Sequence, residues 1–202
     1  TYTTLSLYFV TALFSMPLSM LFAALQFSAP KFIRYIFDIY AWIFRGTPLI
    51  LQLIFFYYGL PLMTNNLIAF PAFTSAAITF ILNYSAYLME IFRAGIESIE
   101  KGQFEAAYVL NLNRRQIMTR IILPQAVRRV LPPLSNEAIN LVKDTALVIV
   151  LGIGDLMLHA REILTRDFKL LPFVIAGIIY LAFTSVLVLI FRRLEKKYVI
   201  RN

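Results

Sequence analysis

Three long stretches without a charged residue constrain the fold of this chain more than any other feature. Residues 1–30, 46–89 and 170–191 contain no Asp, Glu, Lys or Arg. About 20 apolar residues can cross a bilayer as a helix, so the outer runs predict one span each and the middle run predicts two. With 60% hydrophobic residues and only 15% charged residues, the chain has more apolar surface than one soluble core of this size can bury. The sequence therefore predicts an all-α, polytopic membrane protein.

Turn-forming residues divide the middle run into two spans. Tyr58-Gly59-Leu60-Pro61 and Asn65-Asn66 predict a loop between two helices. One more span, the fourth along the chain and the fifth in total, is predicted from about Pro133 to Gly152, although it contains charged residues that an ordinary lipid-facing helix would not tolerate. Because the chain begins without methionine or a basic region, we expect a truncated sequence rather than a signal peptide at its start.

The distribution of charge predicts how the spans are oriented. The net charge is +8, but the excess is concentrated in residues 93–129, with seven basic and three acidic residues, and in residues 192–201, with five basic residues and Glu195. Such segments are typical of the cytoplasmic side, and this pattern favours membrane topology over nucleic-acid binding. Residues 59–73 have no charge and residues 155–169 have balanced charge, so both are expected outside. The amino terminus is then outside and the carboxyl terminus is cytoplasmic.

The composition offers no basis for redox, metal or nucleophilic chemistry. The chain has no cysteine and one histidine, His159, so neither a thiolate site nor a histidine ligand cluster is predicted. No phosphate-binding loop of the form G-x-x-x-x-G-K-[ST] occurs, and His159 lies in a predicted outer loop. We therefore expect a chain that is not an enzyme and binds no cofactor itself.

The predicted fourth span carries a polar stripe. Its members recur at helical spacing: Asn136, Glu137, Asn140, Lys143 and Asp144. Lipid contact would be costly, so the stripe must face protein or water. It could form a wall of a substrate pathway, or it could be a satisfied network in which Lys143 pairs with Glu137 or Asp144 and holds helices together.

The third predicted span adds further candidate pathway residues, and again two interpretations stay open. Asn83, Tyr84, Tyr87 and Glu90 recur at helical spacing and could contact a polar ligand. Glu90 could instead pair with Arg93 at i+3, and the tyrosines could be packing residues.

A predicted helix from Pro30 ends at Arg45-Gly46-Thr47-Pro48, where glycine and proline should break or kink it. Arg45 could pair with an acid in the pathway or extend its charge to the membrane surface as a helix anchor.

Residues 93–129 form a charged, helix-forming segment between the apolar runs. Glu105 is expected in the first turn of a short helix whose apolar face, Phe104, Ala107 and Tyr108, could lie in a groove of a soluble partner. Ala106 and Ala107 would allow close approach of another backbone. Asn111 is expected to end that helix in the left-handed conformation. Asn113 is expected to cap a second helix that runs through Arg114 to about Leu123, before Pro124.

This segment, with Glu105-Ala106-Ala107, then Asn111, then Ile121 and Leu123-Pro124, resembles the Glu-Ala-Ala loop of permease subunits in ATP-binding-cassette (ABC) importers. The family usually has glycine where this chain has Asn111. Two further stretches resemble the polar amino acid subfamily: Arg45-Gly46-Thr47-Pro48-Leu49 with Gln52-Leu53, and Ala86-Tyr87 through Glu90-Ile91-Phe92-Arg93-Ala94-Gly95-Ile96. The resemblance covers about residues 30–195.

The resemblance implies a single permease domain over residues 1–202 with the type I ABC importer fold, in which residues 93–129 form the cytoplasmic coupling loop. It implies import of a polar amino acid across the bacterial cytoplasmic membrane, and the carboxylates of the stripe favour a basic amino acid. The implied partners are two ATPase subunits that use ATP and Mg²⁺, a second permease, an external amino acid binding protein and lipid. The implied coupling residues are Gly102, Glu105, Ala106, Ala107, Asn111, Arg114, Leu123 and Pro124.

Two other protein classes, and one other interpretation of the charged loop, remain open at this point. A secondary transporter or ion channel would use the polar stripe without nucleotide, but it would not need the charged loop, and only one broken helix is visible in the sequence. In a membrane scaffold, every intramembrane charge would be structural. The charged loop could also be an amphipathic helix that lies on anionic lipid.

Overall fold

The computed structural model describes residues 2–198, and each regular element in that range is helical. The long helices are α1 (Tyr2–Ser28), α2 (Lys31–Gly46), α5 (Ala72–Glu97), α8 (Leu123–Asp144) and α10 (Leu171–Tyr198). The shorter helices are α3 (Leu49–Ile54), α4 (Leu60–Met63), α6 (Lys101–Val109), α7 (Arg114–Gln116) and α9 (Leu156–Asp167). Two π-helices, η1 (Phe55–Gly59) and η2 (Ile117–Ile122), and a 3-10 helix, η3 (Thr145–Leu151), join neighbouring helices. The predicted all-α fold is confirmed. Arg201 of the basic tail lies outside the described residues.

Fewer than five helices qualify as membrane spans by length and composition. Within the described residues, α1, α5 and α10 are long and apolar enough to cross a bilayer. A fourth crossing arises if α2 and the helical segment Leu49–Met63, which are bent by 103° relative to each other, form one broken span. Helix α8 does not qualify, because five of its residues are charged. The predicted count of five spans is therefore not reproduced by this measure.

The predicted break after α2 is confirmed. Thr47 and Pro48 adopt extended backbone angles between α2 and α3. The chain therefore turns sharply here, and this elbow places the start of α3 beside α5.

The predicted loop between two helices is present at Asn65-Asn66, but it does not include Tyr58–Pro61 as expected. The helix continues through these residues to Met63, because Pro61 follows the π-helix η1, whose wider turn accommodates a residue without a backbone N–H. The chain turns only at Asn65 and Asn66, which have positive φ angles of 49° and 63°.

The second helix of the charged segment, which was expected to end near Leu123, continues without interruption into the fourth predicted span. Pro124 and Pro133 do not begin or end a helix; α7, η2 and α8 form one rod from Arg114 to Asp144. As at Pro61, a π-helix precedes Pro124. After α8, η3 stops before Gly152, whose φ of 67° is left-handed; this agrees with the span boundary predicted near Gly152.

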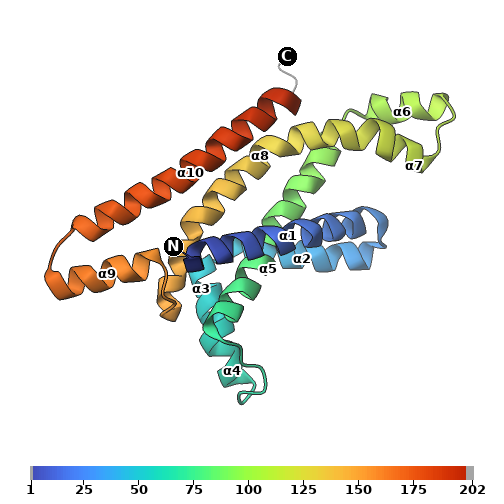
Figure 1. Ribbon diagram of the computed structural model, residues 1–202. Coiled ribbons are helices and arrows are strands. Elements are labelled where there is room, and N and C mark those ends of the chain that lie inside the picture. Colours follow the sequence, from blue (N-terminus) through green and yellow to red (C-terminus); the bar gives the residue numbers. More distant parts are fainter. Residues whose placement is uncertain (1, 199–202) are drawn as a thin grey trace.

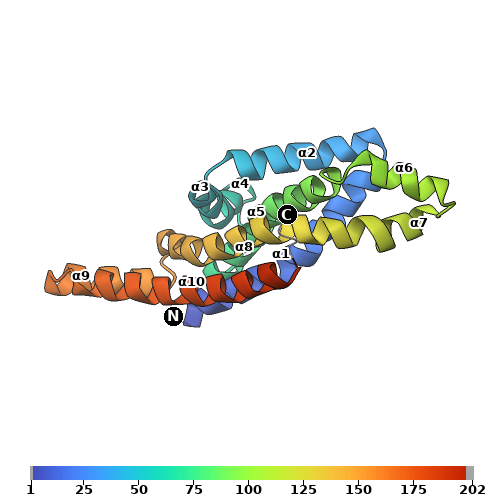
Figure 2. The ribbon, with the colours of Figure 1, turned by 90° about the horizontal axis from the view of Figure 1, so that it is seen from above.

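Helix α5 is the centre of the packing. Figure 2 shows α5 and α8 between α2 on one side and α10 on the other, while α1 runs along α5. A core cluster joins these elements through Leu7 of α1, Leu53 of α3, Phe80 of α5 and Leu141 of α8. In contrast, only 6% of the apolar window of α10 is buried, so this helix offers most of its surface to lipid or to another chain.

Two polar contacts hold the peripheral helices. Gln26 of α1 donates to Asp38 of α2 at 2.7 Å, and Ser135 of α8 donates to Glu195 of α10 at 2.8 Å.

In Figure 1, α6 and α7 lie at the opposite end of the molecule from α4. The charged segment and the uncharged 64–71 turn are thus separated along α5, as opposite sides of a membrane require.

Candidate functional site

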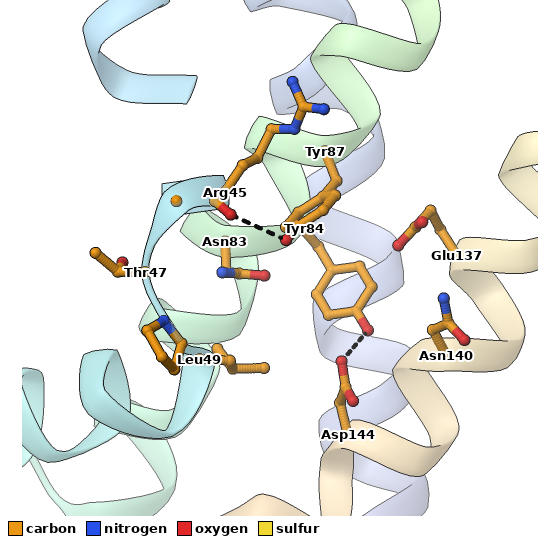
Figure 3. A pocket seen from close by; sticks show the side chains of 11 residues that line it. Arg45, Thr47, Leu49, Asn83, Tyr84, Tyr87, Glu137, Asn140 and Asp144 are labelled. Carbon is orange, nitrogen blue, oxygen red and sulfur yellow. Dashed lines mark hydrogen bonds between the residues drawn. The ribbon is translucent and has the colours of Figure 1, made fainter. Parts of the chain in front are cut away.

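A polar cavity of about 440 Å³ lies between the elbow, α5 and α8. Its size is within the range of roughly 300–1,000 Å³ that is common for small-molecule sites. Figure 3 shows Glu137, Asn140 and Asp144 of α8 opposite Asn83, Tyr84 and Tyr87 of α5, while Thr47 of the elbow points away from them. The lining residues are Arg45, Gly46, Thr47, Pro48, Leu49, Asn83, Tyr84, Tyr87, Glu137, Asn140 and Asp144.

The structure divides the polar stripe of α8 between two faces. Glu137, Asn140 and Asp144 line the cavity. Asn136 and Lys143 lie on exposed parts of the same helix and do not line it. Residues at i, i+3 and i+7 share one line along a helix, and the neighbouring positions share another, so a stripe this wide covers two directions.

Asp144 is held by a neutral donor rather than by a cation. The Tyr84 hydroxyl donates to Asp144 Oδ2 at 2.7 Å (Figure 3). In the described part of the chain, no Lys or Arg lies within 4.0 Å of Glu137 or Asp144. The alternative in which Lys143 neutralises one of them is therefore wrong, and both carboxylates remain available in the cavity.

The elbow wall is fixed by a buried amide network. Asn83 donates to the Phe44 carbonyl at 2.9 Å and to Gln52 Oε1 at 3.0 Å. Gln52 in turn donates to the Phe44 carbonyl at 2.9 Å and to the Thr47 hydroxyl at 2.8 Å. These bonds satisfy carbonyl groups that the helix break leaves without helical partners. Asn83 thus lines the cavity and also fixes the shape of its wall.

A second cavity of about 610 Å³ continues toward the α6 end of α5. It shares Arg45, Tyr87 and Glu137 with the first cavity, so the two meet at these residues. Glu90 lines the second cavity only.

Glu90 is the centre of an ion-pair chain. Arg93 Nη2 lies 2.5 Å from Glu90 Oε2, which confirms the expected i to i+3 pair. Arg45 Nη1 lies 3.3 Å from the same oxygen, so Arg45 does pair with an acid that lines a cavity. Arg93 also binds Glu97 at 2.9 Å.

The charged segment 93–129 folds as a hairpin of helices. Asn111 ends α6 with a left-handed φ of 56°, and the Asn113 side chain caps α7 by accepting from the Gln116 N–H at 2.9 Å. Both predictions are confirmed. Gly102, Glu105, Ala106 and Arg114 are exposed, as are Leu123 and Pro124 on the returning rod.

Two expectations for α6 are wrong. Glu105 lies beyond the first turn, because α6 begins at Lys101. Two of the three residues of the predicted apolar face are also unavailable to a partner: Ala107 is buried, and Phe104 packs beside it against Ile117 and Ile122, because η2 runs back along α6. Tyr108, the third residue, is 60% exposed. Ala107 therefore supports α6 from inside this chain.

Sequence reasoning missed several residues that form these two sites. Gln52 was noted only as part of a motif, although a polar side chain two turns into an apolar run was a usable signal. Val109 and Leu110 were also missed; together with the predicted Tyr108 they form an apolar end of α6, and Tyr108, Val109 and Leu110 are 60%, 86% and 71% exposed. Such an exposed apolar group next to charged residues is typical of a protein interface.

The chain is similar to amino acid permeases along most of its length. It is 36% identical to the putative glutamine transport system permease protein GlnP of Rickettsia bellii (strain RML369-C), over 95% of this chain and 87% of that protein. It is 37% identical to the arginine transport system permease protein ArtQ of Bacillus subtilis (strain 168), over 96% and 88%. It is 42% identical to the glutamine transport system permease protein GlnP of Escherichia coli (strain K12), over 77% and 71%.

Solved structures give the same result. A crystal structure of an amino acid ABC transporter with histidines superposes with a TM-score of 0.88 at 33% identity, covering 96% of this chain and 90% of that chain. The inward-facing MetNI methionine ABC transporter shares the fold at 16% identity, with a TM-score of 0.81 over 98% and 94% of the two chains. The ABC importer permease fold that the resemblance implied is confirmed. Residues 15–200 match the family described as the binding-protein-dependent transport system inner membrane component, and the chain belongs to this family.

Proposed function

We propose that this chain is the permease subunit of an ABC importer for amino acids and that basic amino acids are its cargo. Family membership and the relatives named as glutamine and arginine permeases support the importer class over an ion channel or a scaffold. The cargo class rests on one observation: Glu137 and Asp144 line one cavity, and in the described residues neither has a basic partner within 4.0 Å.

Electrostatics explains why this observation favours a cationic cargo. A carboxylate inside a membrane protein is costly unless it is paired or hydrogen-bonded. Two carboxylates in one cavity raise this cost, and a cargo with two cationic groups lowers it. Arginine, lysine and protonated histidine each carry an α-ammonium group and a cationic side chain, whereas glutamine carries only the α-ammonium group. A basic amino acid is therefore the better electrostatic complement.

The coupling role belongs to the exposed end of α6. Glu105 and Ala106 are exposed beside the apolar residues Tyr108, Val109 and Leu110. This combination of a charged rim and an apolar centre suits a groove on a soluble ATPase subunit. ATP and Mg²⁺ would be bound there, and this chain would contribute the pathway. We place the α6 end in the cytoplasm and the amino terminus outside, because the cytoplasmic side carries the excess of basic residues.

The remaining partners follow from the same assignment. The exposed Asn136 and Lys143 of α8 need protein or water rather than lipid around them, which supports a second permease against this face. An external binding protein would deliver the cargo to the outer surface.

Uptake into proteoliposomes tests the function. The permease is reconstituted with its ATPase and binding protein, and uptake of arginine, lysine, histidine and glutamine is compared. Asp144→Asn and Glu137→Gln each remove one charge–charge contact, worth about 1.5–3 kcal/mol, so arginine uptake at low concentration should fall roughly tenfold or more. Glu97→Gln, an exposed carboxylate of α5 outside both cavities, is the matched control and should leave uptake unchanged.

The possible results test the importer class and the basic-cargo class separately. ATP-dependent uptake of glutamine alone would support the importer and contradict the basic cargo. An ATPase activity that ignores the permease and every amino acid would contradict both.

A further inference from the structure

Arg45 occupies the junction of the two cavities. It lines both of them, together with Tyr87 and Glu137. Its guanidinium lies 5.5 Å from the centroid of the Tyr87 ring and 3.3 Å from Glu90. In Figure 3 the guanidinium lies at the end of the first cavity opposite Asp144. A permanent cation therefore stands where cargo passes from one cavity to the other.

The contact between Arg45 and Glu90 can be exchanged at low cost. Glu90 also accepts hydrogen bonds from two nitrogens of Arg93, at 3.2 Å and 2.5 Å, so it stays paired when Arg45 leaves. The Arg45 side chain is 43% exposed, whereas that of Glu90 is 17% exposed. Glu90 is thus the fixed partner, and Arg45 is the partner with room to move.

The charges of the first cavity complete the argument. Its lining carries one cationic side chain, Arg45, and two carboxylates, Glu137 and Asp144. A basic amino acid carries the opposite set: one α-carboxylate and two cationic groups. Guanidinium groups bind carboxylates through paired, charge-assisted hydrogen bonds.

We propose that Arg45 is a specificity-determining residue that binds the α-carboxylate of the cargo, and that it leaves Glu90 to do so. This inference rests on the proposed function, since it assumes that the cavity binds amino acids. The exchange also carries a signal. Arg45 belongs to the end of α2 and Glu90 to α5, and α6 follows α5 after three residues. Cargo that takes Arg45 from Glu90 therefore removes one of the contacts between the end of α2 and the helix that leads to the ATPase, while the Asn83 hydrogen bonds remain.

Two ligands that differ only in the α-carboxylate test the assignment. Arginine and agmatine, which is arginine without this group, are titrated into the purified permease–ATPase complex in lipid nanodiscs. Arg45→Gln should weaken arginine binding about tenfold, equivalent to about 1.4 kcal/mol, and change agmatine binding less than twofold. Arg45→Lys keeps the charge and should restore part of the arginine affinity.

A second variant should change affinity in the opposite direction. Glu90→Gln removes the competitor for Arg45, so arginine should bind several-fold more tightly while agmatine binding stays constant. Glu97→Gln is the matched control, because Glu97 binds Arg93 and does not contact Arg45. The reciprocal changes would not arise from a general loss of structure.

The outcomes distinguish this inference from the proposed function. If arginine and agmatine bind to the unaltered complex but Arg45→Gln weakens both equally or neither, the assignment of Arg45 is wrong and the proposed function stands. If the unaltered complex binds neither ligand, the basic-cargo function fails and the role of Arg45 fails with it.

Discussion

Substituting Gly95 with alanine tests the packing that joins the cavity region to the coupling segment. Gly95 lies in α5 where it meets α8, and an added Cβ would lie 2.2 Å from Val130 Cγ2 and 3.5 Å from the Ala126 carbonyl oxygen. Carbon atoms pack at about 3.5–4.0 Å, so the separation of these two atoms would have to increase by about 1.3–1.8 Å, through movement of the helices or of Val130. Val130 is only 6% exposed and has little free space.

The loss of stability caused by this steric collision can be distinguished from the gain in helix propensity that alanine brings. Overpacking of this kind costs about 1–3 kcal/mol, while replacing a helical glycine by alanine gains about 1 kcal/mol. Gly177→Ala in α10 is the matched control, because an added Cβ there has no neighbour within 4 Å. We expect the Gly95 variant to be less stable than the Gly177 variant by about 1–3 kcal/mol.

A double-mutant cycle identifies the contact. Val130→Ala removes the colliding methyl group, so combining it with Gly95→Ala should cost less than the sum of the single changes, by about 0.5–3 kcal/mol. Thermal unfolding of the purified complex, followed by intrinsic fluorescence, gives the relative stabilities. Equal stability of the two glycine variants, or strict additivity in the cycle, would refute the packing argument.

Three further changes test other parts of the structure. Asn83→Leu leaves the Gln52 amide oxygen without its donor and removes one of the two donors to the Phe44 carbonyl, so the complex should lose about 1–3 kcal/mol of stability in the same thermal assay. Asn111→Gly keeps the left-handed turn without a side-chain penalty, so stability and ATPase coupling should be unchanged or improved; a clear loss would show that the Asn side chain has another role. Glu105→Ala changes an exposed residue, so the melting temperature should hold within a degree or two while cargo-stimulated ATP hydrolysis falls at least several-fold; unchanged coupling would contradict the role of α6.

Features that depend on a few neighbouring residues could be predicted from the sequence. Asn111 ends a helix and Asn113 caps the next because their side chains act on the adjacent backbone. The break after Gly46 follows from Pro48 in the same way, because proline lacks a backbone N–H and favours extended backbone at the preceding Thr47. The apolar runs also predicted α1, α5 and α10 by length and hydropathy alone.

Features that depend on tertiary packing could not be predicted in this way. From the sequence alone, Pro61 and Pro124 are each expected to interrupt a helix. In the structure each follows a π-helix, and the helical path continues through both prolines. Ala107 looked like a residue available to a partner, but η2 folds back and covers it. In each case, the local pattern is compatible with two structures and packing selects one.

The candidate site also combines features that the local sequence predicts with features that depend on tertiary packing. Periodicity placed Glu137, Asn140 and Asp144 on one helix side, which was enough to bring them into one cavity. It did not reveal that Asp144 binds Tyr84, because that contact joins residues 60 positions apart. Nor did it separate the two faces of the stripe, since the boundary between them depends on where α5 and the elbow lie.

The two faces of α8 link cargo binding to assembly. One face carries Glu137 and Asp144 into the cavity, while Lys143 stands on an exposed part of the same helix. A lysine at the centre of a lipid-facing helix costs about 2.5–3.5 kcal/mol, so that part of α8 is expected to meet protein or water in the assembled transporter. A rigid helix transmits displacement from one face to the other. Under the proposed function, movement of a second permease against Lys143 would therefore shift Glu137 and Asp144 relative to Arg45 and would separate the charges proposed to bind a basic cargo.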